Sequence, residues 1–308
     1  MYYLGIPTTR AGTVITSDST VERDPYYDGN NIHEKCAIIS RIAPNFFRFG
    51  SFEIFKQSSD GRAGPSADDN QLKKQLLDHV LLYYPDITRK HAIPTSTEAT
   101  ESAVYAELYK EIVTRTAVLV AKWQTVGFVH GVLNTDNMSI MGLTIDYGPF
   151  GFCEHFDPEY TPNGSDNTGR YSYENQVEMC KWNLLKLAEV FAPFVSPQTA
   201  ATILNDVEGF DTIYEREYVN TMCAKLGLAT PHTMVESCDS VELIESLFEC
   251  MAATHADFTD TFIALTGLAE ALDAMPADQL GLPVEEHKLI SGAVDTLVRD
   301  YSLSQLTR

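Results

Sequence analysis

The sequence predicts an α+β protein with a small β-rich N-terminal part and a larger, mostly helical remainder. Residues 1–57 contain short apolar runs separated by turn signals, a pattern typical of strands. From residue 71 onward, apolar residues recur three and four positions apart, which is typical of amphipathic helices. A polar segment rich in Gly, Pro, Ser and Asp at residues 58–70 marks the boundary between the two parts.

The N-terminal part is expected to contain two strands. The runs "AGTVITSD" and "KCAIISRIA" are apolar and short, and "ERDPYYDGNN" between them carries the Asp-Pro and Asp-Gly signals of a turn. The aromatic run "NFFRFGSFEIF" that follows fits either a strand or a link to the next layer.

The remainder is expected to contain a series of helices. The run "NQLKKQLLDHVLLYY" has its apolar residues on one stripe and is stopped by Pro85. A long helix, "STEATESAVYAELYKEIVTRTAVLVAKWQTVG", opens with Ser and Thr caps and early Glu residues, and ends at Gly127. The further helical segments are "VEMCKWNLLKLAEVFAP", "SPQTAATILNDVEGFDTIYEREYVNTMCAKLGL", "SVELIESLFECMAAT", "DFTDTFIALTGLAEAL" and "VEEHKLISGAVDTLVRDYSL".

The composition excludes several classes of protein. The 308 residues are 44% hydrophobic, but 43 acidic residues outweigh 22 basic ones and give a net charge of −21. Such a surface repels nucleic acid and anionic membranes, so neither is an expected partner. No apolar run approaches the length of a membrane-spanning helix, and the first residues form neither a signal peptide nor an Arg-rich transit peptide.

The scattered cysteines have no metal-binding spacing, which favours buried free thiols in a reducing compartment: Cys36, Cys153, Cys180, Cys223, Cys238 and Cys250.

The stretch "HGVLNTDNMSIMGLTIDYGPFGF", residues 130–152, carries the main chemical signal. A protein-kinase catalytic loop runs His-Arg-Asp, four residues and Asn, with a metal-binding Asp-Phe-Gly after a short hairpin. Here Asn137 follows His130 by the same seven positions, and Asp146 opens Asp-Tyr-Gly. The position of the kinase base is Val132, which cannot accept a proton, whereas Asp136 stands immediately before Asn137.

These residue types suit phosphoryl or nucleotidyl transfer. Mg²⁺ prefers oxygen ligands, which the Asn137 amide and the Asp146 carboxylate supply, and Asp136 is the candidate general base. The alternative is an ordinary Asn- and Asp-rich turn before a hairpin. The in-register spacing of His130, Asn137 and Asp146 after a long helix favours a functional site. His130 itself is expected to order the loop through hydrogen bonds, rather than to bind a ligand.

These residues resemble the selenoprotein O family (SelO, also called YdiU). "GFVHGVLNTDNMSIMGLTIDYGPFGF" is similar to its signature, and further segments are similar in the same order: "YYLGIPTTRA", "RIAPNFFRFGSFEIF", "GRYSYENQVEMCKWNLLKLAEVFAP" and "ADFTDTFIAL". The resemblance extends from residue 1 to about residue 270. It implies a protein-kinase-like fold that transfers AMP, and not phosphate, from ATP to protein hydroxyl groups, with ATP bound in a flipped orientation.

The resemblance also implies roles for individual residues. Asp136 matches the catalytic proton acceptor, while Asn137 and Asp146 match the Mg²⁺ ligands, with Asp146 also touching ATP. It implies ATP as substrate, Mg²⁺ with Mn²⁺ as an alternative metal, and protein substrates with Ser, Thr or Tyr hydroxyl groups. A monomer is expected, in mitochondria if the source is a eukaryote and otherwise in the cytoplasm.

The resemblance does not include the family's segment that holds the nucleotide phosphates. Its Gly-rich loop, strand Lys with an acidic partner and two phosphate-holding Arg residues precede "LGIPTTRA", which here begins at Leu4. The chain is therefore expected to be truncated at its N-terminus, with residues 1–57 as a remnant of the N-lobe, 58–70 as a loop and 71–308 as the helical C-lobe. Three arginines could point at the cleft, although salt bridges to this acidic chain are the expected use: Arg10, Arg41 and Arg48.

Two other functions stay open from the sequence. One is a non-catalytic remnant that has lost its ATP site and binds partners through its helical lobe. The other is a metal-dependent hydrolase that uses Asp136 and Asp146, although no His-rich ligand set accompanies them.

Overall fold

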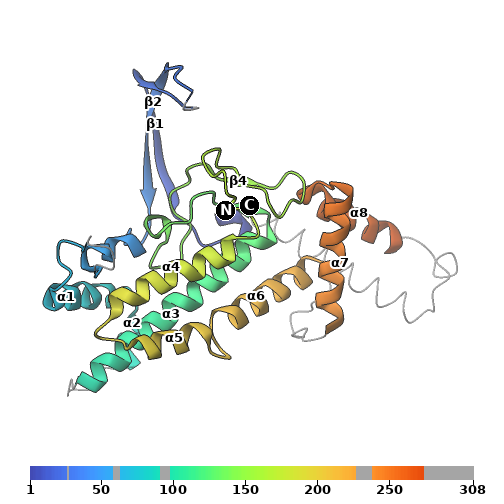
Figure 1. Cartoon of the computed structure of the whole chain (residues 1–308). Coiled ribbons are helices and arrows are strands. Elements are labelled where there is room, and N and C mark those ends of the chain that lie inside the picture. The colour runs from blue at the N-terminus through green and yellow to red at the C-terminus, as the bar shows by residue number, and fades with distance from the viewer. Residues whose placement is uncertain (26–27, 58–62, 91–97, 227–237, 274–308) are drawn as a thin grey trace.

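The computed structural model describes residues 1–25, 28–57, 63–90, 98–226 and 238–273. This part of the chain is α+β, with eight α-helices and two small antiparallel sheets. Figure 1 shows the helices gathered in one body, from which a long hairpin stands away. In chain order the elements are η1 (Tyr2–Leu4), β1 (Arg10–Arg23), β2 (Ile32–Ile42), η2 (Phe49–Phe55), α1 (Asn70–Leu81), α2 (Pro85–Lys90), α3 (Glu98–Thr125), β3 (Phe128–Val129), η3 (Thr135–Asn137), β4 (Gly151–Phe152), α4 (Gln176–Phe191), α5 (Pro197–Asn205), α6 (Phe210–Lys225), α7 (Cys238–Thr254) and α8 (Phe258–Asp273).

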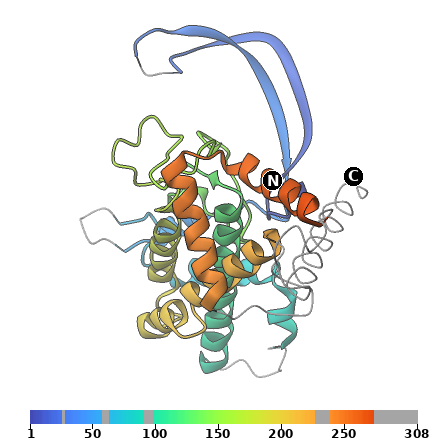
Figure 2. The same cartoon turned by 90° about the vertical axis from the view of Figure 1, so that its right-hand side faces the viewer.

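The hairpin confirms the two predicted strands but leaves their apolar side chains exposed. β1 and β2 pair antiparallel, with Arg10 opposite Ile42 at the base. Figure 2 shows the pair curving away from the helices. Val14 and Ile38 on the two strands are 61% and 67% exposed. A two-stranded ribbon with both faces in water is marginally stable by itself. The contacts at the base of the hairpin therefore determine where the hairpin lies.

In the aromatic run "NFFRFGSFEIF", residues 49–55 form the 3₁₀-helix η2 and not a strand, which was one of the two expected forms. A 3₁₀-helix has three residues per turn, so every third side chain lies on the same face. Phe49, Phe52 and Phe55 follow this spacing, and each is at most 2% exposed. The three buried Phe side chains thus anchor η2 in the larger hydrophobic core of the helical body.

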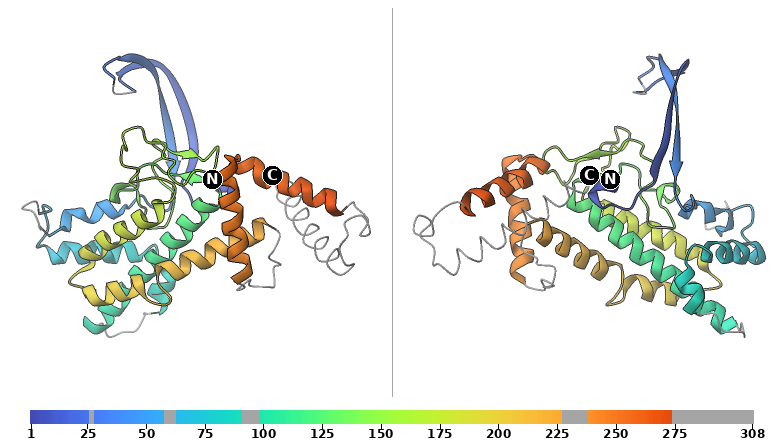
Figure 3. Two further views of the ribbon diagram at one scale, coloured as in Figure 1. Left: turned by 45° about the vertical axis from the view of Figure 1, so that its right-hand side comes forward. Right: turned by 180° about the vertical axis from the view of Figure 1, so that it is seen from behind.

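The helical body is built around α3. This 28-residue helix packs against α4, α5 and α6, and Figure 3 shows these helices running side by side from two further directions. Tyr109 of α3 and Phe52 of η2 both pack against Phe191, the last residue of α4. Phe191 is completely buried, so it joins three elements of the main core.

The predicted helices of the middle region are largely confirmed. α1 ends before Pro85, which is not a final stop because it opens the short helix α2. The run from Ser196 to Leu228, read as one helical segment, divides into α5 and α6. A Cβ on Gly209, at the start of α6, would lie 2.6 Å from the Leu204 carbonyl oxygen. The helix predicted at residues 284–303 lies outside the described residues.

A second, smaller core lies between β3, α6, α7 and α8. It contains Val129, Met222, Ile244, Phe248 and Phe258. In the described part of the chain, no helix combines the length and the apolar character that crossing a membrane requires.

Replacing Phe191 with Ala is expected to lower the free energy of unfolding by about 3–5 kcal/mol, because a cavity would open where α3, α4 and η2 meet. Chemical denaturation monitored by circular dichroism measures this change. The matched control is Leu185→Ala on the same helix, whose side chain is 45% exposed, and we expect a loss below about 1 kcal/mol. Equal losses in both variants would contradict the packing described here.

Candidate functional site

His130 orders the start of the loop that follows β3. Its ring is 1% exposed, and Nε2 lies 2.8 Å from the Ile145 carbonyl oxygen. Its backbone N–H donates a 2.9 Å hydrogen bond to Oε1 of Gln176 at the start of α4. Burial lowers the pKa of His130 below its ordinary value, so the ring is neutral at neutral pH. The prediction that His130 orders the loop through hydrogen bonds is confirmed.

Asn137 and Asp146 line the same hollow, which has a volume of about 350 Å³. Its other lining residues are Arg41, Val132, Tyr147, Gly148 and Pro149. The structure therefore brings together two residues that the sequence places nine positions apart. It also adds Arg41, which comes from the end of strand β2.

The side chain of Asn137 is oriented by the loop itself. Its Nδ2 donates a 2.9 Å hydrogen bond to the carbonyl oxygen of Val132, the residue at the kinase base position. This bond uses the amide nitrogen, so the oxygen atom of the amide is the end that can act as an acceptor or a ligand.

Asp146 is held between two arginines. Arg41 Nη1 lies 2.7 Å from Asp146 Oδ1, and Arg48 Nη2 forms an ion pair with Oδ2. Burial alone would raise the pKa of Asp146, but the hydrogen bonds and charges of the two arginines outweigh it, and the net pKa is lowered. The carboxylate is therefore charged at neutral pH.

The backbone of Asp146 also adopts an uncommon conformation. Its φ of 54° lies in the left-handed region, which Asp tolerates better than most residues other than Gly. Backbone strain of this kind concentrates at functional sites, where the surrounding structure imposes it.

Asp136 lies beside the hollow but is not one of its lining residues. It is exposed on the 3₁₀-turn η3 and packs against Gly50 of η2. A Cβ on Gly50 would come within 2.1 Å of Asp136 Oδ1, so no larger residue fits there without a shift of the carboxylate. The neighbouring Thr135 hydroxyl donates to Oε1 of Glu53, also in η2.

Backbone hydrogen bonds fix two N-terminal segments against this loop. The Phe49 N–H donates to the Met138 carbonyl oxygen at 2.9 Å. The Thr144 N–H donates to the Pro7 carbonyl oxygen, also at 2.9 Å. Nε1 of the buried Trp123 donates to Oγ1 of Thr144 and ties the same region to α3. Segments that are distant in sequence thus fix the position of Asp146.

The donor set fits a Mg²⁺ ion. Mg²⁺ in nucleotide sites is held by one or two protein oxygen ligands, with phosphate and water completing the shell. Asn137 and Asp146 provide one neutral and one charged oxygen ligand to the same hollow. The described residues include no group of three or more His, Cys, Asp and Glu side chains that could hold a metal ion by themselves. The hollow therefore suits a metal that arrives with phosphate.

The sequence left the use of three arginines open. Arg41 and Arg48 do form salt bridges as expected, and their common partner is the candidate metal ligand Asp146. Arg10 instead stacks over the ring of Tyr2 at 3.5 Å. Arg41 and Arg48 both lie in the segment "RIAPNFFRFGSFEIF", whose resemblance to the family was the signal in the sequence that could have linked them to the site.

The cysteines near the site behave as structural thiols. Cys153, just after β4, is buried, and burial raises its pKa to about 12. Among the other described cysteines, Cys36, Cys180 and Cys250 are not in disulfide bonds. Cys153 is thus protonated and poorly reactive at neutral pH.

Comparison with known proteins places this chain in a family of nucleotidyltransferases. A family model described as Protein adenylyltransferase SelO matches residues 1–296. The chain is 51% identical over 269 residues to "Protein adenylyltransferase SelO, mitochondrial" of Mus musculus and 49% identical over 277 residues to the protein of the same name in Homo sapiens. It is 38% identical over 270 residues to "Protein nucleotidyltransferase YdiU" of Nitrosospira multiformis. The chain belongs to the SelO family.

The alignments cover most of this chain but less than half of these relatives. They cover 86%, 89% and 87% of this chain for the mouse, human and bacterial proteins, respectively. The corresponding shares of those proteins are 39%, 40% and 44%.

The buried His130 is expected to make stability depend on pH. The unfolded chain takes up a proton near pH 6.5, whereas the folded chain does so only at lower pH. The free energy of unfolding should therefore fall as pH drops below about 6.5, by at most about 1.4 kcal/mol per pH unit from this residue. Asp146, whose pKa is lowered, adds a separate loss only below about pH 4.

Chemical denaturation between about pH 7 and pH 5 tests this dependence. His130→Gln should be less stable than the wild type at neutral pH and should lose less stability on acidification. His33→Gln is the control, because that ring is exposed on β2. An unchanged pH slope in His130→Gln would contradict the assignment.

Proposed function

We propose that this chain carries the catalytic and metal-binding part of an ATP- and Mg²⁺-dependent protein adenylyltransferase, which transfers AMP to protein Ser, Thr or Tyr hydroxyl groups. Two observations support the proposal. The chain belongs to a family whose model is described by that activity. Asn137 and Asp146, which match the family's metal ligands, line one hollow beside Arg41.

Each site residue has a distinct role in this proposal. Asp136 accepts the proton of the attacking hydroxyl group; its exposure on η3 leaves the carboxylate accessible to a protein substrate. Its packing against Gly50 restricts the positions that the carboxylate can take. Asn137 and Asp146 would hold Mg²⁺, and Asp146 would also contact ATP.

A bound Mg²⁺ would neutralise negative charge on the phosphates of the substrate. In a chain of net charge −21, the cations near the hollow matter for the same reason. Arg41 lines the hollow directly, and Arg48 lies on the other oxygen of Asp146. We assign both arginines to the orientation of Asp146, and Arg41 also to attraction of the phosphates.

We propose a protein-kinase-like arrangement for this part of the chain. Within the described residues, strands β1 and β2 would be the remnant of the N-lobe, and the helices from α1 to α8 would form the C-lobe. The order of His130, Asn137 and Asp146 along the chain supports this division. The exposure of β1 and β2 supports the division as well. Two strands with apolar side chains are marginally stable alone, and in an N-lobe sheet further strands or a packed layer would cover them.

The proposal extends to metal, partners and location. Mg²⁺ is the proposed metal, with Mn²⁺ as an alternative, and proteins with hydroxyl side chains are the proposed substrates. Neither nucleic acid nor membrane is a proposed partner, and a monomer is the proposed state. The mouse and human relatives are named as mitochondrial, so we propose a mitochondrial location in a eukaryotic source and a cytoplasmic one otherwise.

Transfer of radiolabel from ATP distinguishes AMP transfer from phosphate transfer. Label in the α-phosphate should appear in protein, and label in the γ-phosphate should not. Asp146→Asn should reduce incorporation at least about 100-fold, because it removes the charged ligand from the hollow. A thermal melt must show that the variant is folded, since it also loses two ion pairs. Transfer of the γ-label would contradict the proposal and indicate a conventional kinase.

Asp136→Asn should separate catalysis from nucleotide binding. We expect incorporation of AMP to fall about 100-fold or more, with affinity for Mg²⁺-ATP changed less than about threefold, because Asp136 lies outside the lining of the hollow. The control is Asp86→Asn, an exposed residue of α2 that pairs with Arg89. Full activity of Asp136→Asn would exclude it as the proton acceptor.

A further inference from the structure

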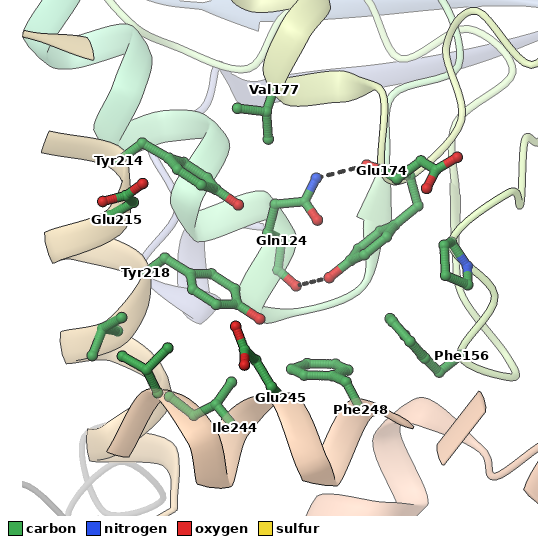
Figure 4. Close-up of a pocket in the computed structure, with 14 residues that line it drawn as sticks. Gln124, Phe156, Glu174, Val177, Tyr214, Glu215, Tyr218, Ile244, Glu245 and Phe248 are labelled. Carbon is green, nitrogen blue, oxygen red and sulfur yellow. Dashed lines mark hydrogen bonds between the residues drawn. The ribbon is translucent and has the colours of Figure 1, made fainter. Parts of the chain in front are cut away.

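A second cavity, of about 540 Å³, lies between α6, α7 and the segment that leads into α4. No residue lines both this cavity and the hollow at Asp146. Aromatic side chains form much of its wall: Phe156, Tyr173, Tyr214, Tyr218 and Phe248. Figure 4 labels four of them, Phe156, Tyr214, Tyr218 and Phe248, which come from different elements.

Packing and hydrogen bonds hold these walls in place. The rings of Phe156 and Phe248 lie 4.6 Å apart, centroid to centroid. The rings of Tyr214 and Tyr218 are stacked on successive turns of α6, with centroids 5.9 Å apart. The Tyr173 hydroxyl donates to the Gln124 carbonyl oxygen, and Gln124 Nε2 donates to the Tyr173 carbonyl oxygen, both at 2.7 Å. The cavity is thus largely preformed, as ligand pockets usually are.

The charged residues of the lining are all acidic. They are Glu174, Glu215 and Glu245, and no Lys or Arg lines the cavity. Within the described residues, none of the three forms an ion pair with a basic side chain. In Figure 4, the Glu245 carboxylate points toward the Tyr218 hydroxyl, and Glu174 and Glu215 lie at opposite edges. Among the described residues, the carboxylates beside the aromatic wall therefore have no ion-pair partner.

The tyrosines add to the preference for a cation. Burial, together with the negative charge of Glu215, raises the pKa of Tyr214 to about 12. Burial also raises the pKa of Tyr218, and the charges of Tyr214 and Glu245 add to the effect. Both phenols are therefore neutral at neutral pH. Their ring faces can attract a cation, and arginine is the side chain most often found in such contacts.

We infer that this cavity binds a basic polypeptide segment, with an arginine side chain inserted between Tyr218 and Glu245. The volume is within the range of sites for ligands much larger than a single side chain. Carboxylates at opposite edges suit successive cationic side chains spread along a backbone. A nucleotide or another anion would be repelled. The inference concerns binding alone and does not depend on adenylyl transfer.

Fluorescence anisotropy with a labelled Arg-containing peptide tests the inference, in the absence of nucleotide and metal. The comparison peptide carries citrulline in place of arginine, which keeps the shape and removes the charge. We expect the Arg peptide to bind at least about tenfold more tightly, and its affinity to fall as salt is raised. Equal binding of the two peptides, or equally tight binding of the free amide of arginine, would overturn the inference.

Variants locate the binding. The double variant Glu174→Gln with Glu245→Gln should bind the Arg peptide about tenfold or more weakly. The control is Glu249→Gln, on the same helix α7 but outside the cavity lining, which should bind like the wild type. Both changes lie at exposed positions, and thermal melts verify the fold. Unchanged binding by the double variant would overturn the inference. Sedimentation that shows a dimer for the wild type and a monomer for the double variant would also overturn the inference, because a second copy of the chain would then occupy the cavity.

Discussion

The carboxylate of Asp146, held between Arg41 and Arg48, joins the N-terminal segments to the helical body. Burial opposes the charge of this carboxylate, but the two guanidinium groups outweigh that effect and lower its pKa. Each such pair, partly open to water, contributes little stability by itself, on the order of 1 kcal/mol or less. The two ion pairs instead determine where the hairpin lies, because they fix its base at the mouth of the hollow that Asn137 also lines.

Around these ion pairs, the loop that carries the candidate site has little regular structure, but side chains of α4 hold its backbone through hydrogen bonds. Buried side chains satisfy its backbone groups: Gln176 accepts from the His130 N–H and donates to the Phe128 carbonyl oxygen. Asn183 Nδ2 donates to the Leu133 carbonyl oxygen. Since buried backbone groups without partners are costly, each of these bonds restricts the conformations open to the loop. The amide side chains of α4 thus supply hydrogen-bond partners to the backbone of this loop, as a neighbouring strand does in a sheet.

The sequence predicted the helices and the spacing of the site, but not the contacts that complete it. The periodicity of apolar residues reveals α1, α3 and α4, because burial on one face dictates that pattern. The η2 helix was missed, since a three-residue spacing of Phe also fits a link between layers. The shared partner of Arg41 and Arg48 could not be predicted, because a choice among 43 acidic residues is made by the tertiary fold.

The same carboxylate thus pairs with both arginines and, in the proposed function, would also be the charged ligand of the metal. Calorimetric titration of the chain with Mg²⁺-ATP tests this most directly, with the wild type and Asp146→Asn compared side by side. The account predicts that Asp146→Asn binds Mg²⁺-ATP at least about tenfold more weakly than the wild type. Equal, measurable affinity of the two proteins would contradict it.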